Sequence, residues 1–165
     1  MNRATKIIAA LALAATGVAV GYLATPRPLP ATRLATLSGQ SVALADLRGK
    51  VVLVNFWATS CDVCVAEMPK LVQQYNRLAA RGFDTVAVAM SYDHPNAVAG
   101  FAQGQHLPFK VALDTSGELA QAFRVMGTPT SVLLDRHGKV LARFEGEPDW
   151  RSFDALVEKS LADPA

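Results

Sequence analysis

Both cysteines of this chain lie in one short stretch, FWATSCDVCVAEMP, at residues 56–69. Cys61 and Cys64 are separated by two residues, at the point where a helix is predicted to begin. Unpaired N–H groups and a partial positive charge at a helix N-terminus stabilise a thiolate. The spacing brings both sulfurs to one side of the first turn, where they can close a small disulfide. We predict that Cys61 is the exposed attacking thiol and Cys64 the resolving thiol.

A metal site and a structural disulfide are the two alternatives for this pair. Zinc takes four ligands, and the chain has no second cysteine pair. The three histidines, His94, His106 and His137, show no paired ligand spacing. A disulfide across so short a loop adds little stability, because the stabilisation grows with loop length. The sequence therefore favours a redox dithiol, with no metal and no other cofactor.

The elements that must position the cysteines follow an α/β pattern. The run VVLVNF at 51–56 is typical of a strand buried on both faces. A helix from Thr59 or Ser60 to Ala80 follows, with Pro69 inside it. The other predicted elements are two short strands around Ser38-Gly39, a strand at 83–90, a helix opened by Pro95 and capped by Asp93 or His94, an extended piece within 107–114, a helix at 116–125, an antiparallel strand pair at 127–135 and 139–146, and a helix at 148–162. This order implies a central mixed sheet with helices on both faces.

The N-terminal residues predict export of the domain. The segment 7–23 carries no charge and follows Arg3 and Lys6, as in a signal-anchor whose N-terminus stays in the cytoplasm. A cleaved signal peptide is the alternative for residues 1–23. Residues 24–33, ATPRPLPATR, form a proline-rich linker. The folded domain is then expected to occupy residues 34–165.

The distribution of charge gives no support for nucleic-acid binding. The chain has 16 Lys and Arg residues against 14 Asp and Glu residues, a net charge of +2. Arg3 and Lys6 account for the whole excess, so the body of the protein is neutral. We find no basic run and no basic stripe interleaved with aromatic residues.

Two stretches closely resemble a known family. VVLVNFWATSCDVCVAEMPKL at 51–71 and GTPTSVLLDRHGKV at 127–140 are similar to thioredoxin-like proteins of the TlpA/ResA type. These are membrane-anchored thiol-disulfide oxidoreductases that face the bacterial periplasm or outer surface. The resemblance covers most of residues 34–162 and implies a thioredoxin-like fold, with an N-terminal hydrophobic anchor helix in front of it. It also implies that Cys61 attacks and Cys64 resolves.

The resemblance implies further site residues. Pro129 matches the family's cis-proline, which would present the backbone of Thr128 to a substrate strand; an ordinary trans proline at a strand start is the alternative. Trp57 matches a tryptophan under the active site, is assigned with Ser60 to the substrate-binding surface, and is equally compatible with a plain core role. Glu67 matches a glutamate thought to tune the cysteines or relay protons. The alternative for Glu67 is a solvated acid in the first turns of a helix.

Several positions depart from the familiar patterns. Ser60 replaces an aromatic residue before the first cysteine, and Val63 replaces a proline before the second. Asp62 adds a negative charge that disfavours the thiolate, which argues against a strong oxidant. Asn55 stands where thioredoxins have a buried aspartate, and an amide does not titrate. Glu67 is then the nearest candidate proton acceptor in the sequence, unless Asn55 simply ends its strand by bonding to backbone.

The predicted function is a thiol-disulfide oxidoreductase that reduces disulfides of exported proteins on the periplasmic side of the inner membrane. The resemblance implies a membrane electron-transfer protein as reductant, and apocytochrome c or metal-centre assembly proteins as typical substrates. A peroxiredoxin-like peroxidase is one alternative, although Ala58 stands where such enzymes place a threonine. A binding or chaperone module with weak redox turnover is the other. Copper delivery is disfavoured, because it uses C-x-x-x-C spacing with a histidine.

Overall fold

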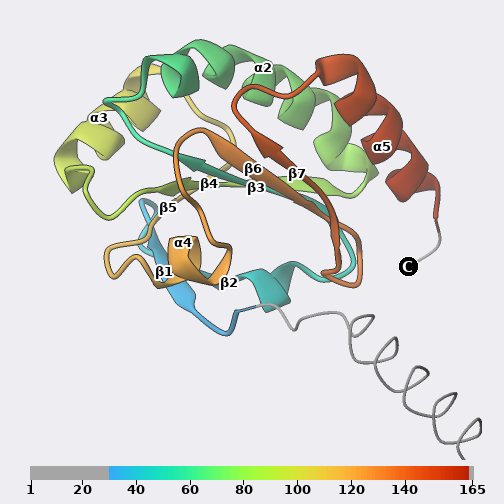
Figure 1. Cartoon of the computed structure of the whole chain (residues 1–165), viewed down its shortest axis with the longest axis horizontal. Coiled ribbons are helices and arrows are strands. Elements are labelled where there is room, and N and C mark those ends of the chain that lie inside the picture. Colours follow the sequence, from blue (N-terminus) through green and yellow to red (C-terminus); the bar gives the residue numbers. More distant parts are fainter. Residues whose placement is uncertain (1–29, 164–165) are drawn as a thin grey trace, which may run out of the picture.

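Seven strands form one mixed sheet in the computed structural model, which describes residues 30–163 (Figure 1). The strand order is β2-β1-β5-β4-β3-β6-β7. The strands are β1 (Arg33–Thr36), β2 (Ser41–Ala43), β3 (Val51–Trp57), β4 (Phe83–Ala89), β5 (Lys110–Leu113), β6 (Thr130–Leu134) and β7 (Val140–Glu145). The helices are η1 (Leu44–Leu47), α2 (Asp62–Leu78), η2 (Ala79–Arg81), α3 (Pro95–Gly104), α4 (Glu118–Ala122) and α5 (Trp150–Ala162).

Strand β3 is the central element that leads into the cysteine pair. All of its residues are buried, and it pairs in parallel with β4 and antiparallel with β6. Alternate side chains point to opposite faces of the sheet. Leu53 and Trp57 belong to the core cluster that includes Met68 of α2, whereas Val54 and Phe56 belong to the opposite cluster. A continuous apolar run therefore satisfies two cores at once.

Helices cover both faces of the sheet, as the element order predicted. In Figure 1, α2, α3 and α5 lie on one side, and α4 lies on the other. The core residues agree: Phe153 and Val157 of α5 join the cluster under α2, and Leu119 of α4 joins the opposite cluster with Leu47 of η1. The predicted central mixed sheet is confirmed.

Helix α2 begins later than the sequence predicted. Its first residue is Asp62, because Cys61 has extended backbone and acts as the N-cap. The helix ends at Leu78, and the last predicted residues form the 3₁₀ turn η2, which Gly82 closes with φ 94°. Helix α3 starts at Pro95 with His94 as its cap, one of the two expected capping residues.

The predicted anchor at 1–23 and most of the linker lie outside the described residues. Within residues 30–163, no helix is both long enough and apolar enough to cross a bilayer. The described fold begins with β1 at Arg33, close to the predicted start of the domain at residue 34.

Candidate active site

Cys61 and Cys64 form a disulfide at the N-terminus of α2. Their Cα atoms are 5.2 Å apart, and the backbone N–H of Cys64 donates to Sγ of Cys61 over 3.2 Å. Cys61 is half-buried, whereas Cys64 is completely buried. A partner can therefore reach the sulfur of Cys61 more easily than that of Cys64, which is the asymmetry that an attacking and a resolving thiol require.

The Thr128–Pro129 peptide bond is cis, the isomer that the resemblance implied. Strand β6 begins directly after it, and Phe56 of β3 pairs with Thr130 of β6. Continuing this register places Pro129 next to Trp57, where β3 ends and the chain turns toward Cys61. Pro129 is buried and Thr128 is half-buried, so Thr128 is the part of this segment that reaches the surface.

Glu67 is a buried carboxyl group on α2. Only 1% of the residue is exposed, so the alternative of a solvated helix acid is wrong. Burial raises the pKa of Glu67 from 4.5 to about 7; a hydrogen bond from Asn55 opposes this rise, and the charge of Glu147 adds to it. Glu67 and Cys64 are three residues apart on the same helix, so they lie on the same face. A carboxyl group with a pKa near neutrality can accept a proton there.

Asn55 does not end its strand by bonding to backbone. Its Nδ2 donates to Oε1 of Glu67 over 2.9 Å and to Oγ of Ser131 over 3.0 Å. The residue is completely buried in β3. The sequence indicated that Asn55 cannot titrate, but it gave no sign of Ser131, because the two residues are 76 positions apart.

Trp57 lies below the surface. It is completely buried, and its ring packs against Phe101 of α3 with centroids 5.2 Å apart. In this position Trp57 cannot touch a docked substrate, which corrects its assignment to the substrate-binding surface. It supports the cysteine segment from within the core.

Exposed apolar side chains occur next to the cysteines in sequence and near Thr128. Ser60 is exposed, and three large apolar residues, Val63, Tyr92 and Met126, are 50%, 63% and 91% exposed. The hydroxyl of Tyr92 lies 3.4 Å from Oγ1 of Thr128. Sequence reasoning did not single out Tyr92 or Met126. For Met126, the available signal was a large apolar residue directly before the GTPT motif.

Asp93 holds the segment that leads to Cys61. Its carboxylate accepts from the backbone N–H and from the hydroxyl of Thr59, both over 2.6 Å. Sequence reasoning considered Asp93 only as a possible helix cap, and His94 takes that position instead. Because Asp93 follows β4 and Thr59 follows β3, the parallel pairing of these strands brings the two residues together.

We expect Asp93→Ala to loosen the cysteine segment. Hydrogen bonds to a charged group contribute more than neutral ones. Losing both should lower the free energy of unfolding by about 2 kcal/mol and slow disulfide exchange several-fold. Urea denaturation and an exchange assay on the same samples measure the two effects.

Asp135→Ala is the matched control for this change. Asp135 accepts from the backbone N–H groups of His137 and Lys139 in the β6–β7 turn, so its loss also removes a carboxylate from a loop. We expect lower stability with an unchanged exchange rate. Equal slowing in both variants would contradict a specific role of Asp93 at the cysteine segment.

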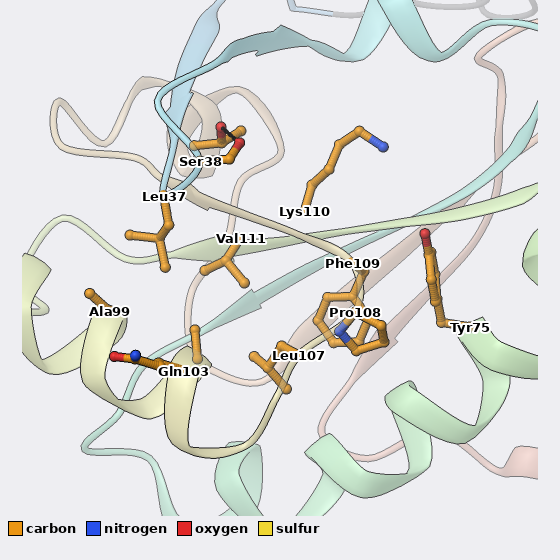
Figure 2. A pocket seen from close by; sticks show the side chains of 12 residues that line it. Leu37, Ser38, Tyr75, Ala99, Gln103, Leu107, Pro108, Phe109, Lys110 and Val111 are labelled. Atoms are coloured by element: carbon orange, nitrogen blue, oxygen red, sulfur yellow. Dashed lines mark hydrogen bonds between the residues drawn. The ribbon is translucent and has the colours of Figure 1, made fainter.

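A separate hollow of about 510 Å³ lies between the β1–β2 turn, the end of α3 and the start of β5 (Figure 2). Leu37, Tyr75, Phe109 and Val111 are among the side chains that line it. None of its lining residues carries a thiol, a carboxylate or an imidazole. Within residues 30–163, no group of three or more metal-ligating side chains is placed to hold an ion.

Comparison with known proteins agrees with this geometry. The Redoxin family model matches residues 25–160. A relative named thiol-disulfide oxidoreductase ResA, from Bacillus thuringiensis subsp. konkukian, is 33% identical over 123 residues, which cover 74% of this chain and 70% of the relative. A second ResA, from Geobacillus thermodenitrificans, is 36% identical over 125 residues, with 76% and 68% covered.

Solved structures show the same fold. The crystal structure of a thiol:disulfide interchange protein of the thioredoxin family, from Chlorobium tepidum TLS, superposes with a TM-score of 0.75. It is 32% identical and covers 84% of this chain and 99% of its own. The predicted thioredoxin-like fold is thereby confirmed. With most of its length matched by the family model, the chain belongs to the Redoxin family.

Proposed function

We propose that the protein is a thiol-disulfide oxidoreductase that reduces disulfide bonds in exported proteins. The observation that carries this proposal is the Cys61–Cys64 disulfide at the N-terminus of α2. The cis peptide bond before Pro129 lies at the start of β6, which pairs with β3, the strand that leads to Cys61. The buried sulfur shares a helix face with a buried carboxyl group, Glu67. Relatives named thiol-disulfide oxidoreductases support the reaction class.

The reaction starts from the reduced protein. The Cys61 thiolate attacks one sulfur of the substrate disulfide; a bond forms between Cys61 and the substrate, and one substrate thiolate leaves. The Cys64 thiol then gives its proton to the Glu67 carboxylate, and the Cys64 thiolate attacks Sγ of Cys61. The mixed disulfide breaks, and the second substrate thiolate leaves. Two electrons pass to the substrate, and its two thiolates take up two protons, one from Glu67 and one from solvent.

The two cysteines are activated by different groups: Cys61 by the N-terminus of α2, and Cys64 by the buried carboxyl group. Cys61, as the N-cap, faces the positive end of the α2 dipole, which favours its thiolate. Cys64 is buried, and burial without a charge partner disfavours a thiolate. A nearby proton acceptor with a pKa of about 7 removes this obstacle at neutral pH.

The docking site for the substrate is proposed at the exposed rim of the disulfide. An extended substrate segment would pair with the backbone of Thr128, bordered by Ser60 and Val63. Both residues are exposed, and neither is the type that the resembling family usually has there. The identity of the preferred substrate is therefore expected to differ from that of typical family members.

The location and the electron donor belong to the same proposal. An uncharged segment at 7–23 behind Arg3 and Lys6 supports export, with the domain on the periplasmic side of the inner membrane. Continuous reduction then needs a donor on the same side, and a membrane electron-transfer protein that carries a dithiol would supply it. Substrates from cytochrome c maturation or metal-centre assembly fit this placement.

The reduction potential of the Cys61–Cys64 pair tests the direction of the reaction. We expect a value of about −270 mV or lower for the full chain in detergent, equilibrated against defined thiol buffers. A value near about −120 mV would identify an oxidant and contradict the proposal. A pair that does not exchange would support a binding module instead, and peroxide consumption by the reduced protein would support a peroxidase.

A further inference from the structure

Three buried polar side chains connect the three elements that form the site. Asn55 comes from β3, Glu67 from α2 and Ser131 from β6. All three are at most 1% exposed, and two hydrogen bonds from Asn55 join them. Buried polar groups are costly unless paired, so a bridge between a central strand, a helix and the strand after cis-Pro129 requires an explanation.

The donor pattern of Asn55 determines what the Glu67 carboxyl group can do. The Nδ2 group of an amide has two hydrogens. One is donated to Oε1 of Glu67 and the other to Oγ of Ser131. Oε1 must therefore remain an acceptor. A proton on the carboxyl group must then sit on Oε2, which has no hydrogen-bond partner within residues 30–163.

We propose that Asn55 is a positioning residue: by holding Oε1 of Glu67, its amide directs the exchangeable proton to Oε2 and keeps the carboxyl group ready to take the proton of Cys64. This inference rests on the proposed function, in which Glu67 is the proton acceptor. Aspartate at position 55 would itself titrate, whereas the amide leaves a single acid in this part of the core.

The groups around Glu67 determine in which direction its pKa should change when the Asn55 donor is lost. Burial raises the pKa of Glu67 most strongly, and the charge of Glu147, from the turn before α5, raises it further. Asn55 from β3 is the hydrogen-bond donor that lowers it. Cys64 of α2 itself is held in the disulfide and does not titrate in the oxidised protein. Loss of the amide donor should therefore raise the pKa of Glu67.

The test is a pH titration of the Glu67 side-chain carboxyl carbon by ¹³C NMR, on the oxidised full chain in detergent. The Glu67→Gln variant assigns the resonance. We expect Asn55→Leu, which has nearly the same shape, to raise the midpoint by about one pH unit, because a donor to a charged group is lost. An unchanged midpoint in folded Asn55→Leu would overturn the proposal.

Ser131→Ala is the matched control, because it removes a hydroxyl from the same buried bridge but leaves the Asn55 donor on Glu67. We expect a shift less than half as large. An equal shift would overturn the assignment to the amide donor, since general loss of polarity would then explain both variants. If Asn55→Leu does not fold, Asn55→Asp replaces the donor by a second acid, and the midpoint of Glu67 should still rise; no rise would overturn the proposal.

A rate measurement separates this inference from the proposed function. The measured quantity is the rate at which Cys64 releases the mixed disulfide, as a function of pH. Its pH midpoint should be higher in reduced Asn55→Leu than in the reduced wild type. The same substitution in a Glu67→Gln background should produce no shift. A wild type that reduces no disulfide would refute the proposed function, but it would leave the titration of Glu67 measurable. A shift that persists without Glu67 would refute the positioning role alone.

Discussion

Replacing Cys61 by serine is expected to abolish disulfide reduction, with a loss of at least about a thousandfold in turnover. Serine keeps the shape of the side chain but is a far weaker nucleophile at neutral pH. Cys64→Ser is expected to fail differently. Its Cys61 thiolate can still attack a substrate, but no second thiol is present to release the mixed disulfide. This variant should therefore accumulate a covalent complex that thiol reductants dissolve.

Non-reducing electrophoresis after mixing with a disulfide-containing protein measures the second effect, and turnover with excess dithiol measures the first. The double variant Cys61→Ser/Cys64→Ser is the control, because it can form no covalent complex at all. The half-burial of Cys61 and the full burial of Cys64 set the expected order of attack. A complex that forms with Cys61→Ser but not with Cys64→Ser would reverse that order.

The sequence predicted those parts of the fold that depend on residues close together in the sequence. A continuous apolar run was enough to identify β3 as a doubly buried strand, and the apolar spacing after it was enough to identify the body of α2. The error at the start of α2 was local as well. Capping by Cys61 required extended backbone at the residue expected to lie inside the helix.

Polar contacts between distant segments could not be predicted in the same way. The contact of Asn55 with Ser131 depends on the antiparallel register of β3 and β6, and that of Thr59 with Asp93 depends on the parallel register of β3 and β4. A shift of one residue in the β3–β6 pairing would turn the side chain of Asn55 or Ser131 to the other face of the sheet. The burial of Glu67 is a similar case, because a glutamate early in a helix is more often solvated.

Glu67 should also make the stability of the protein depend on pH, by an amount larger than most single substitutions produce. Its pKa is about 7 in the folded protein and 4.5 as the ordinary value. Below pH 4.5 the carboxyl group is neutral in both states, so no free energy is lost. Between pH 4.5 and 7 the unfolded chain releases a proton that the folded protein retains, so stability falls as pH rises. The total loss is about 3 kcal/mol above pH 7.

Glu67→Gln should remove this loss, because glutamine stays neutral and still offers Oε1 to Asn55. In urea denaturation of the oxidised protein, the variant should match the wild type near pH 4 and exceed it by about 3 kcal/mol near pH 8. Glu118→Gln is the matched control: Glu118 is exposed, so that variant should follow the wild-type pH dependence. A Glu67→Gln variant that is no more stable at pH 8 would show that the carboxyl group reaches water when it ionises. Suppose that Glu67→Gln is more stable at pH 8 and that its Cys64 also releases the mixed disulfide more slowly. The protein would then keep a destabilising acid in its core because the reaction needs a proton acceptor there.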